Sequence, residues 1–430
     1  MKLLDFNHMM LIMKRSEHLA VCVADKTVDG MISNAEKGES MANTSGKLDK
    51  FIMKRLNQRL VFSIILRGGS VSRQQIAAQS RMSQMSVGRI IEELEKLGIV
   101  AEENGDESDV GPGRRAKRLR VSSNVFLCVG VEMHRDGINV GIINLHGRVL
   151  RQIQHHKDLS ACPPGDVIAL IGTLIGRILS ENPDLSVEPF VGIACPGLIA
   201  DGVIRFSSQL KWKNVEILSA LQKQTGIRNI FIENEVKARA VAEDLFGVGR
   251  DYERSIVLSI GSGVGSAAVF CHELYRGKLN MAGEIGHICV SPGGNMCECG
   301  RRGCLQTYIA DWAILREART VREDITMQGL LEANANEEPW AINLMNRVLE
   351  YVSIAISILA NTYAPDVIIL CGRLIEEYSM LRDLILKNYK REISDYVLSS
   401  FDLKASDFDS DGTLVGAGTL AAYRLLDEIL

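Results

Sequence analysis

Four cysteines and a histidine lie close together in the segment from Gly286 to Cys304, which reads GHICVSPGGNMCECGRRGC. The chain has ten cysteines, and no others cluster in this way. His287, Cys297, Cys299 and Cys304 have a spacing that can close a tetrahedral site, and thiolates combined with an imidazole select zinc. Four protein ligands leave no open position for catalysis. The spacing therefore predicts a structural Zn²⁺ site with one ion per chain.

Spacing alone leaves other interpretations of this segment open. Cys289 is a fifth candidate ligand, so an all-cysteine site with His287 left free satisfies the same pattern. A set of independent buried thiols is a further alternative. Disulfides are disfavoured, because the longest apolar run near the N-terminus, Met9 to Met13, is too short for a signal or membrane segment. We therefore expect a cytoplasmic protein with reduced thiols.

The charge of the chain is unevenly distributed. The 430 residues carry a net charge of −4 and are 46% hydrophobic, a length and composition that favour two or three domains. Residues 46–121 contain 15 Lys/Arg and 9 Asp/Glu, whereas the rest of the chain contains 34 Lys/Arg and 44 Asp/Glu. A basic unit attached to an acidic body indicates that one part of the protein contacts a polyanion.

The basic unit, residues 46–122, has the pattern of a winged helix-turn-helix. A first helix is expected from Lys50 to Leu66, and Ser72 forms a capping box with Gln75 at the start of a second helix. A third helix opens at Ser83 or Ser86 and ends at Gly98. The expected buried stripe of the third helix consists of Val87, Ile90, Ile91, Leu94 and Leu97. The stretch GPGRRAKRLRVS then returns as a basic hairpin, the wing.

Such a unit lays its last helix in the major groove of DNA. Hydroxyl, amide and guanidinium groups on that helix and on the wing can bond base edges and phosphates. The residues that carry these groups are Ser83, Gln84, Ser86, Arg89, Arg114, Arg115 and Arg118. We predict binding to operator DNA, and the alternative is a small helical protein–protein unit. Residues 1–45 lack periodicity and are expected to form a disordered extension, with Met41 as an alternative start.

From Val125 onward, β hairpins alternate with helices, and the series occurs twice. This predicts an α/β fold with two lobes around a cleft. The first lobe spans residues 123–245 and is joined by the C-terminal helix 412–430, and the second spans 246–411 with the zinc-binding segment 287–304. The second hairpin passes through GSGVG (261–265), whose glycines let backbone N–H groups approach an anionic oxygen, or simply form a tight turn. The matching first loop, Glu132 to Gly137, is bulky.

The chain resembles the ROK family of repressors, open reading frames and sugar kinases, in the branch similar to N-acetylglucosamine- and xylose-type repressors. The resemblance runs from about residue 50 to the end and depends on the winged helix and the motifs IENEVKARAVAE, IGSGVGSAAV, AGEIGH and CECGRRGCLQ. It implies an actin-like, hexokinase/RNase H-like ATPase fold with a sugar in the interlobe cleft. It also favours His287 as the fourth zinc ligand and leaves Cys289 as a spare thiol.

The resemblance further implies which residues bind the sugar. Glu284 and His287 match a Glu and a His that contact sugar hydroxyls in the kinases. Asn234 and Glu235 match an Asn-Asp pair whose Asp is the catalytic base, and Gln306 replaces a sugar-contacting Glu. Carboxylates and amides suit paired hydrogen bonds to vicinal hydroxyls. Helix capping or a surface position is the alternative for Glu284, Asn234 and Glu235.

Departures from the kinase pattern favour a regulator without catalysis. Glu235 is one methylene longer than the kinase Asp, and Glu132 to Asp136 replaces the first phosphate loop, Asp-x-Gly-Gly-Thr. LCGRL (370–374) stands where Gly-Gly-Gly is expected. We predict a sugar-responsive repressor that binds operator DNA and a sugar or sugar phosphate as a homodimer or homotetramer. The alternatives are an active sugar kinase with an added DNA-binding domain and a regulator controlled by a protein partner.

Overall fold

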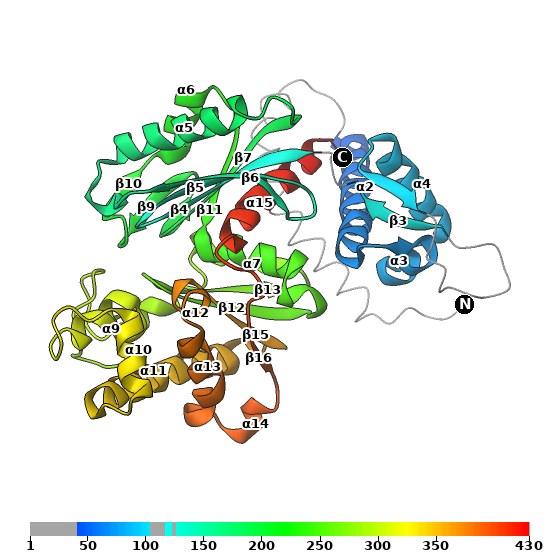
Figure 1. The fold of residues 1–430 in the computed structure, drawn as a ribbon. Helices are drawn as coiled ribbons and strands as arrows, with labels where there is room; N and C mark the ends of the chain where they lie inside the picture. The colour runs from blue at the N-terminus through cyan, green and yellow to red at the C-terminus, as the bar shows by residue number, and fades with distance from the viewer. Residues whose placement is uncertain (1–40, 104–116, 123–125, 430) are drawn as a thin grey trace.

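The computed structural model describes residues 41–103, 117–122 and 126–429 (Figure 1). Helix α2 (Met41–Gly68) is the first described element. The helix was expected to begin at Lys50 but begins nine residues earlier, and no proline interrupts this stretch. The end of the predicted N-terminal extension is therefore before Met41 rather than at residue 45, and residues 1–40 lie outside the described residues.

The N-terminal unit contains α2, α3 (Arg73–Ser80), α4 (Gln84–Lys96) and a sheet of β1 (Val71–Ser72), β3 (Arg118–Val121) and β2 (Val100–Glu103) in that order. The predicted capping box is confirmed: Ser72 Oγ accepts from Gln75 N at 3.2 Å, and Ser72 N donates to Gln75 Oε1 at 2.9 Å. Three helices followed by an antiparallel hairpin are the elements expected for a winged helix-turn-helix.

The buried stripe of α4 differs from the prediction at one position. Val87, Ile90, Ile91 and Leu94 are buried, but Leu97 is 39% exposed. Leu97 is the C-cap, and Gly98 turns the chain away from the helix with a φ of +72°. The next core position is therefore taken by Ile99, which is fully buried.

The two lobes have sheets of matching strand order, which confirms the predicted two-lobed α/β fold (Figure 1). In each sheet, three antiparallel strands are followed by two strands that pair in parallel. The first sheet is β6 (Val149–His156), β5 (Gly137–Ile143), β4 (Leu127–His134), β7 (Val187–Cys195) and β11 (Asn229–Asn234). The second is β14 (Glu273–Tyr275), β13 (Val264–Phe270), β12 (Arg254–Ile260), β15 (Val367–Cys371) and β16 (Asp402–Ala405).

Helices cover these sheets and connect the lobes. The C-terminal helix α15 packs against α7, β4 and β7, so the last element of the chain completes the first lobe. Glycines allow this close approach, because an ideal Cβ on Gly192 of β7 would lie only 1.8 Å from the carbonyl oxygen of Ala417. The helices are α5 (Pro164–Ser180), α6 (Ile217–Thr225), α7 (Glu235–Phe246), α8 (Gln306–Ile309), α9 (Asp311–Ala318), α10 (Met327–Ala335), α11 (Pro339–Tyr363), α12 (Arg373–Glu376), α13 (Ser379–Asn388), α14 (Asp395–Leu398) and α15 (Gly412–Ile429).

A fourth, small sheet was not predicted from the sequence. It consists of β10 (Trp212–Val215), β9 (Val203–Ser207) and β8 (Leu198–Ala200), in that order. Strands of three to five residues are too short for an alternating pattern to stand out from the surrounding loops. The turn between β9 and β10 nevertheless lies beside the pocket between the lobes.

The N-terminal unit shares a hydrophobic core with the body. Val61, Phe62 and Ile65 of α2 belong to the same buried cluster as Leu425 and Leu426 of α15. The rings of Phe62 and Tyr423 meet edge to face with centroids 6.4 Å apart. The unit is therefore packed directly on the first lobe.

One helix among the described residues, α11, is long and apolar enough to cross a membrane. Half of its most apolar window is buried inside the protein. Val352, Ile356 and Leu359 lie in the core of the second lobe. The composition of α11 is accordingly that of a central core helix.

Candidate functional site

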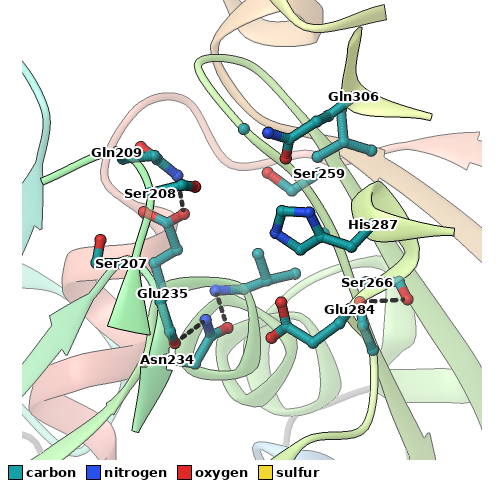
Figure 2. Close-up of a pocket in the computed structure, with 16 residues that line it drawn as sticks. Ser207, Ser208, Gln209, Asn234, Glu235, Ser259, Ser266, Glu284, His287 and Gln306 are labelled. Atoms are coloured by element: carbon teal, nitrogen blue, oxygen red, sulfur yellow. Dashed lines mark hydrogen bonds between the residues drawn. The ribbon is translucent and has the colours of Figure 1, made fainter. Parts of the chain in front are cut away.

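A polar pocket lies between the lobes, at the N-terminus of α7 (Figure 2). Its walls come from the end of β7, the β9–β10 turn, the β12–β13 hairpin, the segment before His287 and the start of α8. The structure brings together all five residues that were predicted to contact a sugar: Asn234, Glu235, Glu284, His287 and Gln306. The enclosed space is about 50 Å³.

Helix capping positions the first two of these residues. Asn234 is the N-cap of α7, and its Oδ1 accepts from Val236 N at 3.0 Å and from Lys237 N at 3.2 Å. Its Nδ2 donates to Gly197 O at 3.0 Å. The capping role considered as an alternative is therefore observed, and the same residue still lines the pocket. Glu235 follows in the first turn, where its carboxylate faces the cavity (Figure 2).

The carboxyl groups at the cleft are poorly solvated. Burial raises the pKa of Glu235 to about 7, although a hydrogen bond from Gln209 opposes the shift. Burial also raises the pKa of Glu132 to about 7, against a hydrogen bond from Asn139, and it raises the pKa of Glu284 against the charge of Lys237. A carboxyl group with such a pKa can donate as well as accept a hydrogen bond near neutral pH.

The cysteine cluster forms a compact group beside the pocket. The candidate ligand atoms of His287, Cys297, Cys299 and Cys304 all lie within 4.8 Å of one another. His287 Nδ1 and Cys297 Sγ are 3.8 Å apart, and the Sγ atoms of Cys299 and Cys304 are 3.7 Å apart. Metal–sulfur bonds of ~2.3 Å in a tetrahedron place sulfur atoms roughly 3.8 Å apart. The four residues therefore fit a tetrahedral metal ion.

Cys289 lies outside this group. Its side chain is exposed, and its thiol donates to the carbonyl of Arg302 at 3.6 Å. The cluster is instead linked to the pocket through His287, which lines both sites, and through Gln306, whose Nε2 donates to Cys297 Sγ at 3.5 Å. A metal held here would fix two residues of the pocket wall.

Sequence reasoning also missed a group of polar pocket residues around the β9–β10 turn. Ser207 reaches the cavity from the end of β9, and Ser208 and Gln209 reach it from the turn. Gln209 Nε2 donates to Glu235 Oε1 at 3.0 Å, and Gln209 Oε1 accepts from Ser262 Oγ at 2.9 Å. The run of three polar residues before the buried Trp212 was the signal that could have indicated a polar turn.

The first hairpin is tighter than the predicted loop. Glu132 and His134 belong to β4, so Arg135 and Asp136 alone form the turn to β5. Glu132 accepts from Asn139 Nδ2 at 3.1 Å in the neighbouring strand. Asp136 accepts from Arg373 Nη1 of the second lobe at 3.2 Å. The hairpin thus presents a carboxylate that pairs across the lobes.

The residues predicted to contact DNA divide into three groups. Ser83, Gln84, Ser86 and Arg89 are exposed on the first two turns of α4. Arg118 lies in β3, where its guanidinium donates to the carbonyl of Ser70 at 3.2 Å, so it does not belong to the tip of the wing. Arg114 and Arg115 lie outside the described residues.

Comparisons with known proteins identify relatives over most of the chain. The model of the ROK family matches residues 128–424. The xylose repressor of Bacillus subtilis (strain 168) is 26% identical over 89% of this chain and 98% of its own length. The glucokinase of Thermotoga maritima is 27% identical over 69% of this chain and 98% of its own length. The crystal structure of a ROK family transcriptional regulator, a homologue of the Escherichia coli MLC protein, superposes with a TM-score of 0.72 at 25% identity, covering 88% of this chain and 98% of that one.

Proposed function

The chain belongs to the ROK family, and from this premise we propose that it is a sugar-responsive transcriptional repressor. Its N-terminal unit acts as a winged helix-turn-helix that binds operator DNA, and its actin-like body binds a sugar between the lobes. The observation that carries the proposal is the combination of exposed polar residues on α4 with a polar interlobe pocket in one chain. The larger share of the chain that the repressor and the regulator match, compared with the glucokinase, supports it.

The pocket favours a neutral sugar over a sugar phosphate. Glu235 and Glu284 line it, their raised pKa values reflect poor solvation, and a phosphate beside them would add like charge. Hydroxyl groups can instead exchange hydrogen bonds with carboxyl and amide groups. The proposed sugar ligands are Asn234, Glu235, Glu284, His287 and Gln306.

We propose that the cleft changes shape when a sugar binds. Its cavity volume of about 50 Å³ has room for a few water molecules, at roughly 10–15 Å³ each by the same measure. A monosaccharide is larger than this volume, so side chains or lobes would move to seat it fully. A ligand that binds two cleft shapes with different affinity shifts their populations, and this is the physical basis of the proposed response.

Helix α7 offers a route from the pocket to the DNA-binding unit. It carries Glu235 in its first turn and Asp244 near its end. Asp244 accepts a hydrogen bond from Arg67 of α2 at 3.1 Å, and its other oxygen lies 2.8 Å from His272 Nδ1 of the second lobe. One buried carboxylate thus contacts the DNA-binding unit and the second lobe together, so a movement of the lobes acts on α2.

Zinc is the metal that we propose for the cluster of His287, Cys297, Cys299 and Cys304. Three thiolates and an imidazole match the preference of this ion, and with four protein ligands it would supply rigidity rather than catalysis. Its contribution would be to hold His287 and Gln306 in the pocket wall.

On the DNA side, we propose Ser83, Gln84, Ser86 and Arg89 as the contacts from α4, with Arg114 and Arg115 of the wing. We also propose Arg118 as a wing contact, with its guanidinium positioned by the bond to the carbonyl of Ser70. Helix-turn-helix proteins usually read two half-sites, so a homodimer or homotetramer in the cytoplasm is expected.

An active sugar kinase is the second candidate, because Glu235 stands at the position of the catalytic base and its pKa of about 7 suits a general base. The ion pair of Asp136 with Arg373, where a phosphate loop would lie, favours the regulator.

The decisive experiment uses Glu284→Ala. DNA duplexes are first selected from a random pool with the wild-type protein, and their affinity is then measured with and without D-xylose, D-glucose or N-acetyl-D-glucosamine. We expect the variant to lose the sugar-induced change in DNA affinity while sugar-free binding stays within about twofold, because Glu284 lies in the pocket and far from α4. Glu323→Ala, which alters an exposed carboxylate outside the pocket, is the matched control. A full sugar response in Glu284→Ala would contradict the assignment of the pocket.

A further inference from the structure

Gln209 connects three parts of the molecule through one side-chain amide. It lies in the turn between β9 and β10, and its Nε2 donates to Glu235 Oε1 at 3.0 Å (Figure 2). Its Oε1 accepts from Ser262 Oγ at 2.9 Å. Glu235 is a pocket residue at the start of α7, and Ser262 belongs to the glycine loop of the second lobe. The amide therefore ties the small sheet, the pocket and the second lobe together.

The same side chain fills the approach to the glycine loop. An ideal Cβ on Gly263 would lie 2.6 Å from Gln209 Nε2, so the amide already packs against the loop backbone. Gln209 and Glu235 both line the pocket, whereas Ser262 is not among its lining residues. Gln209 thus lines the pocket while it bonds a residue of the neighbouring glycine loop.

The carboxylate that Gln209 holds is the one that a ligand would need. Glu235 Oε1 accepts from Gln209, and this is its one hydrogen bond to a side chain among the described residues. A hydroxyl group that approaches Glu235 from the cavity competes with the amide for that oxygen. A hydroxyl that binds Glu235 must therefore break the hydrogen bond from Gln209. The loss of that bond makes the net free energy of sugar binding less favourable.

We propose that Gln209 is an interlobe latch: it closes the sugar-free cleft by bonding Glu235 and Ser262, and a sugar hydroxyl releases it by taking its place on Glu235. This inference rests on the proposed function, since it names how the same pocket is regulated. Release of Gln209 frees the β9–β10 turn from the glycine loop. The sugar then changes the contact between the lobes even though it touches neither Ser262 nor the DNA-binding unit.

Two variants separate a latch from an ordinary sugar contact. Gln209→Leu keeps the size of the side chain but removes both hydrogen bonds. Ser262→Ala removes only the bond to Gln209, at a residue that is not among those lining the pocket. Gln224→Leu makes the same chemical change on α6 of the first lobe, outside the pocket, and is the matched control.

The test measures binding of D-xylose, D-glucose and N-acetyl-D-glucosamine by calorimetry. Because one net hydrogen bond no longer has to be broken, Gln209→Leu and Ser262→Ala should bind the effector roughly 2- to 10-fold more tightly than wild type, and Gln224→Leu should match wild type. Weaker binding by Gln209→Leu with unchanged Ser262→Ala would make Gln209 a direct sugar contact and overturn the latch. Unchanged affinity in both variants would overturn it as well.

A second measurement needs no sugar. Amide hydrogen exchange in the segment 259–266 should be faster in sugar-free Ser262→Ala than in wild type, because the glycine loop has lost its tie to the opposite side of the cleft. Equal exchange in the two proteins would contradict the latch. If wild type binds none of the probe sugars, the proposed function fails, whereas the exchange experiment still decides on the latch.

Discussion

The β4–β5 and β12–β13 hairpins occupy the same position in two sheets of matching strand order, yet they differ in chemistry. The second contains Gly261, Gly263 and Gly265, the last two of which line the pocket, whereas the first turns through Arg135 and Asp136. The two halves of the body therefore share one topology, while the turns of their matching hairpins carry different residues.

Two residues that depart from the kinase pattern are in contact at the first hairpin, although they lie far apart in the sequence. Asp136 comes from the altered first loop, and Arg373 comes from LCGRL, where a glycine run is expected. Their side chains form an ion pair at 3.2 Å, and Arg373 also pairs with Asp311 at the start of α9. The comparison of the hairpins indicates a cleft with a ligand side and a side closed by the protein's own charges.

Phosphoryl transfer is the largest effect that could contradict the difference between the two hairpins. We expect ATP turnover with any of the probe sugars to be at least ~10⁴-fold below the 1–100 s⁻¹ of ordinary kinases, since catalysis depends on positioned phosphates. A coupled ATP-consumption assay measures it, with a ROK glucokinase assayed in parallel as the positive control. Turnover at ordinary kinase rates would show that the β4–β5 hairpin still serves a nucleotide.

A smaller effect is expected when the metal cluster on the ligand side is disrupted. Cys299→Ser should lower the zinc content from about one ion per chain to under a tenth, and should weaken sugar binding at least ~10-fold because His287 and Gln306 lose their support. Metal analysis and calorimetry provide the measurements. Cys289→Ser, which alters the exposed thiol outside the cluster, should keep both metal and sugar. Full sugar affinity in metal-free Cys299→Ser would separate the cluster from the pocket.

The smallest predicted effect concerns the pH dependence of stability. The pKa of Glu235 is about 7 in the folded protein and has an ordinary value of 4.5, so the folded state binds the extra proton. Its favourable contribution is complete below pH ~4.5 and is lost as the pH rises to ~7. Glu235→Gln should therefore be more stable than wild type at pH 8 by about 1–3 kcal/mol, with little difference at pH 4.

Thermal or denaturant unfolding at the two pH values checks this prediction. Glu323→Gln, an exposed carboxyl in the second lobe, should behave as wild type at both. A stabilisation of Glu235→Gln that is equal at pH 4 and pH 8 would show that packing, rather than the buried charge, sets its effect.

The parts of the molecule that the sequence predicted well are those with long periodic or chemically distinctive patterns. Apolar strands of up to nine residues, joined by hairpins, define the two sheets, and soft ligands at short spacing define the metal cluster. The strands β8 to β10 were not predicted because each has at most five residues. The role of Gln209 was not predicted either, since it depends on the position of that small sheet.

The exposure of Leu97 and the location of Arg118 each have a local cause. Leu97 continues the apolar period of α4, but the helix ends at Lys96. Leu97 is its C-cap, and Gly98 then redirects the chain. Arg118 follows the basic run of the wing in sequence, and pairing with Ser72 in β1 places its guanidinium beside the backbone of Ser70. Composition identifies a basic segment, whereas strand register decides where each of its arginines lies, and the contact of Arg118 with DNA stays a prediction.

The core shared by α2 and α15 has a consequence for biosynthesis. Phe62 is translated well before Leu426, and the two belong to one buried cluster. At about 5–20 residues per second, on the order of 20–70 s separate their appearance on the ribosome. During that interval the apolar face of α2 lacks the side chains of α15 that cover it, so the nascent chain presents a target for chaperones. The repressor becomes able to hold its DNA-binding unit in place when α15 has left the exit tunnel.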